Sequence, residues 1–328
     1  MELIDTPANR CPPGANIVGL RAGDGAELRA AFWRPEGVPR GTVALVQGRA
    51  EFIEKYYEVV AELLERGFVV ASFDWRGQGL SQRLAGNRAK GHLRRSTDYR
   101  LDLDAFIRQL LAPDCPKPWF ALAHSMGAAA VLDHSAACEG DEPFARIVGT
   151  APMVDLHGFP GSRMARRLAA GLGALGLRRL FVPGGGPKTL IEKPFAGNVL
   201  TGDQRRFARA ADVIRVAPAV GIGDPTIGWT HAAYHLMDRL TSDGCAERIR
   251  TPVLMLAAGD ERLVSTPAIE VFARRLKTAS CLVLPDSRHE ILMERAEIRA
   301  RFWAAFDAFV PGEFFLHEAA EQASSETS

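Results

Sequence analysis

The segment WFALAHSMGAAAVL, residues 119–132, decides how this sequence folds. Residues 119–123 form an uninterrupted apolar run, which is typical of a strand buried on both faces of a parallel sheet. Residues 128–132 are apolar helix formers, and Ser125 stands between the two runs. A strand that turns sharply into a helix around a serine is the setting of a nucleophile elbow. The segment therefore predicts a βα unit with Ser125 displayed at the carboxyl end of its strand.

The residues two positions on either side of Ser125 are small, as the close approach of strand and helix in an elbow requires. They are Ala123 and Gly127, and Ala123 departs from the usual first glycine of this motif by one methyl group. The alternative interpretation is an ordinary βα turn in which Ser125 caps the helix. The flanking strand and helix favour the elbow.

The same alternation of buried strand and helix runs through most of the chain. Further apolar runs of strand length occupy residues 42–47, 68–73, 146–151, 252–257 and 280–284, and helical spacing is found at 51–66, 99–111 and about 290–310. A hairpin is expected around the Gly23-Asp24-Gly25 turn. Regular strand–helix alternation predicts right-handed crossovers and a mostly parallel, doubly wound α/β sheet.

The alternation is interrupted once, which predicts an inserted cap. Residues 154–245 contain helical patches and glycine-rich breaks, and they are expected to form a helical cap over the carboxyl edge of the sheet. Residues 1–153 and 246–315 then form the two parts of the core. Residues 316–328 are small and polar and are expected to be a disordered tail.

Composition excludes several other classes of protein. Lys plus Arg (40) balances Asp plus Glu (39) in 328 residues, which argues against a nucleic-acid partner held by a net basic field. Five scattered cysteines without a CxxC pair favour reduced thiols over disulfides or a zinc site. An acidic N-terminus and the lack of a long apolar run favour a cytoplasmic address. No metal or organic cofactor is implied.

A serine nucleophile needs a base, and the base needs an orienting acid. In this kind of fold the chain order is serine, acid, histidine, and the histidine follows the last strand. His289 occupies that place, directly after the run at 280–284. The acid should follow the run at 252–257, where Asp260 and Glu261 are adjacent and their spacing to His289 does not separate them.

Acyl transfer also needs hydrogen-bond donors for the developing oxyanion. The first predicted donor is the backbone N–H of Met126, immediately after the nucleophile. The second is the backbone N–H of Arg49, in the loop after the run at 42–47, where Gly48 gives the turn its freedom and is expected to border the substrate.

Taken together, these motifs resemble bacterial lysophospholipases and the related monoacylglycerol lipases, which are α/β-hydrolases. The resemblance covers residues 16–310 and rests on GRAE at 48–51, DWRGQGLS at 74–81, AHSMG at 123–127, HEILME at 289–294, and two cap segments at 198–203 and 223–229. It implies Ser125 as nucleophile, His289 as base and the amides of Met126 and Arg49 as the oxyanion hole. Relatives carry their acid directly before Arg and two apolar residues, which implies Glu261 in preference to Asp260. Monoacylglycerol lipases have His where this chain has Gln47.

The resemblance implies a lipid-like ester as substrate, either a lysophospholipid or a monoacylglycerol. Trp229 and Met164 of the cap are candidate acyl-chain contacts, with simple packing as the alternative. Residues 162–182 place arginines at both ends of an apolar centre, which suits peripheral contact with the inner face of a membrane or, alternatively, a cap helix with solvated arginines and glycines that weaken it. A small-ester esterase or peptidase and a non-catalytic binding protein are the alternative functions.

Overall fold

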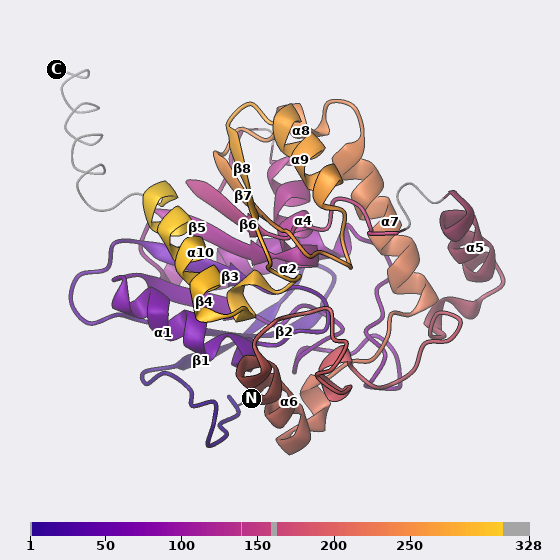
Figure 1. The fold of residues 1–328 in the computed structure, drawn as a ribbon, viewed down its shortest axis with the longest axis horizontal. Helices are drawn as coiled ribbons and strands as arrows, with labels where there is room; N and C mark the ends of the chain where they lie inside the picture. The colour runs from indigo at the N-terminus through magenta and orange to yellow at the C-terminus, as the bar shows by residue number, and fades with distance from the viewer. Residues whose placement is uncertain (1, 139, 159–162, 311–328) are drawn as a thin grey trace.

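A computed structural model describes residues 2–138, 140–158 and 163–310, which form an eight-stranded sheet with helices on both faces (Figure 1). Its strands are β1 (Asn16–Arg21), β2 (Glu27–Trp33), β3 (Thr42–Val46), β4 (Val69–Phe73), β5 (Trp119–His124), β6 (Arg146–Thr150), β7 (Val253–Ala258) and β8 (Ala279–Leu284). Their order in the sheet is β1-β2-β4-β3-β5-β6-β7-β8. β2 pairs antiparallel with both β1 and β4, and all other neighbours are parallel. The predicted α/β fold and the opening hairpin are confirmed.

Alternate residues of the central strands pack into two separate hydrophobic cores, one on each face of the sheet. Val43, Leu45 and Phe120 pack with α1 and α10 on one face, whereas Ala44 and Ala121 pack with α2, α4 and α9 on the other. The helices are α1 (Tyr57–Glu65), α2 (Asp98–Phe106), α3 (Ala112–Asp114), α4 (Ser125–Ser135), α5 (Arg163–Ala174), α6 (Gln204–Val216), α7 (Ile227–Thr241), α8 (Cys245–Arg248), α9 (Thr266–Arg275) and α10 (Ala296–Phe309). Burial on both faces explains why these strands read as continuous apolar runs.

The insertion between β6 and β7 carries α5, α6 and α7, and Figure 1 shows α5 as the outermost of the three, beside α7. Gly171 and Gly173 lie within α5, whereas Gly176, with a φ of 80°, separates α5 from a short 3-10 helix, η3 (Leu177–Arg179). No continuous helix therefore runs from α5 through residue 182, and the expected weakening of α5 by its glycines stays a prediction. Within the part of the chain that the structure describes, no helix is long and apolar enough to cross a membrane. The expected tail at 316–328 lies outside the described residues.

The closing helix differs from the expectation in one respect that matters for the site. The helical pattern at 290–310 is divided into a short 3-10 helix, η6 (Ile291–Met293), and α10. Glu294 separates them in an extended conformation, with ψ 174°. Its side chain is turned toward the insertion, and the break therefore lies where the core meets the cap.

Candidate active site

Ser125 lies in a strained turn at the carboxyl end of β5. Its φ of 51° is in the left-handed region, which a residue with a side chain rarely adopts. A Cβ at Gly127 would lie 2.2 Å from the carbonyl oxygen of Gln47, so only glycine fits there. Ala123, in contrast, is accommodated within β5 and is completely buried. The strand–turn–helix geometry is that of a nucleophile elbow.

Ser125, His289 and Glu261 form a continuous hydrogen-bonded chain. His289 Nε2 lies 2.9 Å from Ser125 Oγ, and His289 Nδ1 lies 2.8 Å from Glu261 Oε2. An ionised carboxylate only accepts hydrogen bonds, so Nδ1 carries the proton and Nε2 is left to accept from the serine hydroxyl. The three residues follow β5, β8 and β7, whose carboxyl ends meet at one edge of the sheet.

The two adjacent acids have different surroundings. The Glu261 side chain is only 2% exposed, and its Oε1 accepts backbone N–H groups of Arg262, Leu263 and Val264 at 2.8–3.3 Å. The Asp260 side chain is 44% exposed and pairs with Arg262 at 3.1 Å and with Arg288 at 3.8 Å. Of these two candidates, Glu261 is the one that contacts His289.

Burial and neighbouring charges together set the protonation of the two histidines beside the serine. Burial lowers the pKa of His289, but the Glu261 carboxylate, with Glu290 and Glu51 further away, outweighs it and raises that pKa above its usual value. His124 lies with its ring centroid 4.8 Å from that of His289 and its Nδ1 3.1 Å from Thr150 Oγ1. Burial lowers the pKa of His124 to about 4, so this ring is neutral near pH 7.

The loop after β3 is held against the elbow by its own side chains. Glu51 Oε2 accepts the Gly48 N–H at 2.5 Å and the Tyr56 hydroxyl at 2.7 Å. Gln78 Nε2 donates to the Gly48 carbonyl at 2.7 Å. A Cβ at Gly48 would lie 3.3 Å from that of Ser125, so glycine allows the loop to approach the serine. Arg49 of this loop and Met126 line the same cavity. The Met126 amide lies in the first turn of α4, where an N–H has no carbonyl partner within the helix.

A cavity of about 370 Å³ opens over Ser125 and His289. Its walls are mainly apolar and come from the core and from the insertion, and they include Met153, Leu156, Leu190, Leu200, Ile222 and Trp229. This volume is at the lower end of the range for small-molecule sites, and such a chamber suits one acyl chain.

The chain matches a known protein family. A family described as serine aminopeptidase, S33 matches residues 37–296, which include the elbow, the acid and the histidine. The chain belongs to this family. It is therefore a serine hydrolase of the α/β-hydrolase type, and the resemblance drawn from the motifs is confirmed.

Two bacterial relatives of this S33 member span most of its length. Lysophospholipase L2 of Escherichia coli is 32% identical over 271 residues, which are 79% of this chain and 76% of that protein. The probable lysophospholipase L2 of Haemophilus influenzae is 28% identical over 284 residues, covering 84% and 86%. A soluble variant of the monoglyceride lipase of Saccharomyces cerevisiae superposes with a TM-score of 0.71 at 18% identity, covering 90% and 94%, and shares the fold.

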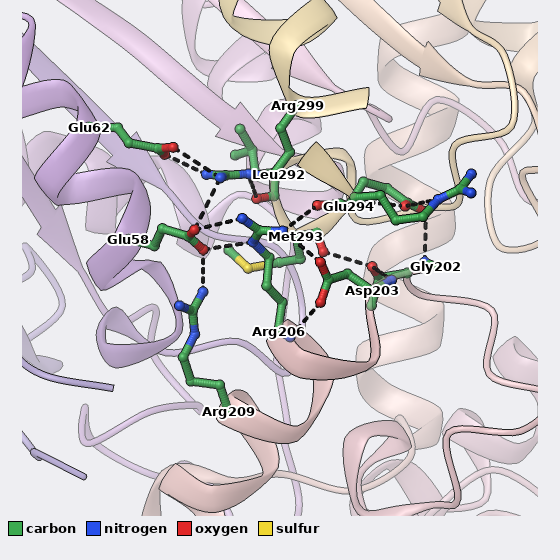
Figure 2. A network of polar contacts seen from close by, with 12 residues as sticks. Glu58, Glu62, Gly202, Asp203, Arg206, Arg209, Leu292, Met293, Glu294 and Arg299 are labelled. Carbon is green, nitrogen blue, oxygen red and sulfur yellow. Dashed lines mark hydrogen bonds and ion pairs between the residues drawn. The ribbon is translucent and has the colours of Figure 1, made fainter. Parts of the chain in front are cut away.

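In this S33 chain, the segment after His289 is hydrogen-bonded to α6 and to the residues just before it in the insertion (Figure 2). The Thr201 hydroxyl donates to the Met293 carbonyl at 2.7 Å, and the Gly202 N–H donates to Glu294 Oε1 at 2.8 Å. Arg206 of α6 donates to the Glu294 carbonyl at 3.0 Å. The break between η6 and α10 thus frees backbone groups that bind the cap, and it fixes the loop that carries His289.

Glu58 of α1 is the anion at the centre of the same network (Figure 2). It accepts hydrogen bonds from Arg206 at 2.7 Å, from Arg209, and from Arg299 of α10 at 3.3 Å. Arg299 also pairs with Glu62 and donates to the Leu292 carbonyl. Core helices α1 and α10 are therefore joined to α6 through one carboxylate. We refer to Glu58 and the three arginines as the Glu58 cluster.

The remaining sequence-predicted contacts lie in different places. Trp229 lines the cavity. Gly48 does not line the cavity and packs instead against Glu51, His124 and Ser125. Met164 belongs to α5, and its side chain is outside the part that the structure describes. Contact of either Gly48 or Met164 with substrate stays a prediction.

Sequence reasoning missed a buried ion cluster beside the triad. Lys55 lines the cavity with Nζ 2.7 Å from Glu51 and 2.5 Å from Glu290. Glu51 lies in the motif GRAE and Glu290 in HEILME, but the motifs alone indicate no role for either residue. The same is true of Gln78, in DWRGQGLS, which holds the neighbouring loop. The available signal was the presence of charged residues in otherwise buried segments, since buried charges are paired.

Proposed function

We propose that this protein is a carboxylic-ester hydrolase that acts on lysophospholipids or monoacylglycerols through an acyl-enzyme. The observation that carries the proposal is the hydrogen-bonded chain from Ser125 through His289 to Glu261 at the base of an apolar cavity. Two relatives that span most of the chain are named as a lysophospholipase or a probable lysophospholipase. The apolar walls suit an acyl chain better than a peptide, which would need polar partners for its backbone.

In the first half-reaction, Ser125 Oγ attacks the ester carbonyl carbon while its proton passes to His289 Nε2. The negative charge that forms on the carbonyl oxygen is held by the N–H groups of Met126 and Arg49. Glu261 stabilises the imidazolium because its carboxylate stays ionised and accepts a hydrogen bond from the Nδ1–H. The tetrahedral intermediate then expels the alcohol, which takes the proton from His289, and the acyl group remains on Ser125.

The second half-reaction repeats these roles with water. His289 removes a proton from water, whose oxygen attacks the acyl carbon, and the oxyanion again lies against Met126 and Arg49. Collapse of this intermediate breaks the bond to Ser125 Oγ and returns the proton to the serine. The products are a fatty acid and the free enzyme, and every proton that leaves Ser125 or water passes through His289.

Peripheral contact with a membrane is part of the proposal. The support comes from α5 and from the turn that follows this helix. Leu168, Leu175 and Leu180 are exposed, Leu175 by 75%, and Arg167 and Arg179 are exposed beside them. Exposed apolar and basic side chains within one short segment favour contact with an anionic bilayer. The alternative, in which the arginines only fasten the cap, applies to Arg166, which pairs with Asp238 and stacks on Tyr234.

A release assay on purified protein tests the proposal. We expect turnover of lauroyl-lysophosphatidylcholine or monolaurin, faster from anionic vesicles than from neutral ones, and a loss of at least about 1,000-fold in Ser125→Ala with an unchanged circular dichroism spectrum. Turnover of p-nitrophenyl butyrate alone, or of an alanine anilide alone, would overturn the lipid assignment. Full activity in Ser125→Ala would overturn the serine mechanism.

A further inference from the structure

Arg49 is a cation in the active-site cavity without an anionic partner. Its Nη2 donates to the Gly223 carbonyl at 2.7 Å, and its guanidinium carbon lies 4.8 Å from the centre of the Trp229 ring. Its Nε is buried and makes no hydrogen bond. None of the described carboxylates lies within 4.0 Å of the guanidinium, although Asp224 lines the same cavity.

The buried Arg29 and Arg76 are paired with carboxylates, whereas the half-buried Arg49 is not. Arg83 is likewise half-buried and donates to backbone carbonyls, but it does not line the active-site cavity. Arg29 contacts Glu54 and Asp74 at 2.6 Å, and Arg76 contacts Asp102 at 2.7 Å. Burial lowers the pKa of Arg49 to about 10, with only weak opposition from Tyr99 and Asp224, so it stays protonated at neutral pH. A partly buried charge without a counter-ion carries a desolvation cost, which an anionic ligand can offset.

The second cation of the cavity is already neutralised. Lys55 lies between Glu51 and Glu290 at 2.7 and 2.5 Å, so its positive charge is already offset by carboxylates of the protein. Asp224 is held by the Gly186 N–H, which donates to its Oδ2 at 2.9 Å. Among the described residues that line the cavity, Arg49 is therefore the cation available to an anion.

The position of Arg49 relates that anion to the ester. The loop bearing Arg49 lies against Ser125 through Gly48. On the cavity wall, the Trp229 indole donates to the Tyr99 hydroxyl at 2.9 Å, and this hydroxyl lies 3.0 Å from Met126 Sδ. The guanidinium is thus connected through Trp229 and Tyr99 to the side chain of Met126, and through Nη2 to Gly223 of the insertion. In a lysophospholipid, three glycerol carbons separate the ester from the phosphate, a spacing comparable to one arginine side chain.

We propose that the Arg49 guanidinium binds the phosphodiester of a lysophospholipid headgroup while its backbone N–H holds the oxyanion. The inference rests on the proposed ester hydrolysis and narrows its substrate class to lysophospholipids over monoacylglycerols. Nε, which is unpaired in the free enzyme, supplies a charge-assisted hydrogen bond to a phosphate oxygen. A monoacylglycerol has a neutral headgroup without a phosphate, so it offers no anionic oxygen to this hydrogen bond.

The test compares two esters that share an acyl chain and differ in the phosphate. Steady-state hydrolysis of lauroyl-lysophosphatidylcholine and of monolaurin is measured below their critical micelle concentrations for wild type, Arg49→Met and the control Arg205→Met. Arg205 is exposed on α6 and lies outside the cavity. We expect Arg49→Met to lose about 10- to 100-fold more in kcat/KM for the lysophospholipid than for monolaurin, and the difference should arise chiefly in KM. Arg205→Met should match wild type on both.

Inhibition of the wild-type enzyme provides a measurement whose main comparison, between inhibitors, needs no variant. Glycerophosphocholine should compete with substrate more strongly than inorganic phosphate or laurate, and Arg49→Lys should keep part of this inhibition because it keeps the charge. Stronger inhibition by phosphate or laurate would assign the cation to a free anion or to the product and overturn the proposal.

The remaining outcomes separate this inference from the function on which it rests. Equal losses on both esters in Arg49→Met would mean that Arg49 only clamps the loop to Gly223, and the inference fails. Wild type that hydrolyses monolaurin but not the lysophospholipid overturns the inference and leaves the ester hydrolase standing. Wild type that hydrolyses neither overturns both.

Discussion

Replacing Glu58 by Gln removes the anion that joins α6 to α1 and α10. The change keeps the size of the side chain but leaves Arg206, Arg209 and Arg299 around a neutral amide (Figure 2). Arg206 retains Asp203 as a partner and Arg299 retains Glu62. Arg209 loses the carboxylate that it contacts. We therefore expect a large loss of stability from a single isosteric substitution.

The pKa of Glu58 gives the magnitude. Burial acts to raise it, but the hydrogen bonds from Arg206 and Arg209 and the charge of Arg299 outweigh burial and lower this pKa from 4.5 to about 2. A shift of this size corresponds to about 3 kcal/mol of unfolding free energy. The pKa is depressed on folding, so this stabilisation is fully present above pH 4.5 and is lost as the pH falls toward 2. The side chain is 25% exposed, and solvent screening reduces the expected loss to about 2–3 kcal/mol.

Urea unfolding followed by tryptophan fluorescence measures this loss at pH 7, with Glu65→Gln as the matched control. Glu65 belongs to the same helix and is exposed, so its neutralisation should change the unfolding free energy by less than about 0.5 kcal/mol. The difference between wild type and Glu58→Gln should shrink as the pH is lowered below 4.5. A Glu58→Gln variant as stable as the control at pH 7 would refute the reasoning, because the cluster would then add nothing to the folded state.

Two further predictions concern the hydrogen-bonded chain at the serine. Glu261→Gln should lower kcat by about 100-fold or more, because the amide no longer stabilises the imidazolium. Asp260→Asn should lower kcat by less than about threefold. The two variants are assayed side by side, and equal effects would mean that Glu261 is not the acid of the triad. His289 acts as a base only when it is neutral, and its pKa is raised above the usual 6.5, so kcat/KM should increase with pH through a midpoint above 6.5. In Glu261→Gln the midpoint should move to lower pH, and a midpoint that stays in place would mean that Glu261 does not set the His289 pKa.

Much of the fold could be predicted because the strands of this sheet are buried on both faces. Such strands are continuous apolar runs, and the elbow is the sharpest of the boundaries between run and helix. The position of His289 followed from the order of the strands and required no knowledge of distance. The structure does bring His289 to 2.9 Å from Ser125.

The features that residue patterns alone could not predict depend on contacts between distant segments. Spacing does not separate Asp260 from Glu261, and only the family resemblance favours Glu261. The path of the backbone turns Glu261 toward His289 and Asp260 toward Arg288. The break at Glu294 is equally hidden, since the composition of 290–310 is helical and its partner Gly202 lies in the cap. Local propensity is overridden there because the cap supplies hydrogen bonds that a continuous helix would not make.

The loop after β3 joins catalysis to recognition, which changes where specificity is expected to lie. Glu51 fixes Gly48 and neutralises Lys55, and the same loop directs the Arg49 side chain onto Gly223 and Trp229 of the insertion. Movement of the cap would therefore shift the guanidinium and, through the backbone of the same residue, the proposed oxyanion donor. If Arg49 binds the headgroup, substrate binding and oxyanion geometry are coupled within one residue. In that case the Glu58 cluster, which holds α6 against the core, acts on the site through the cap as well as through the His289 loop.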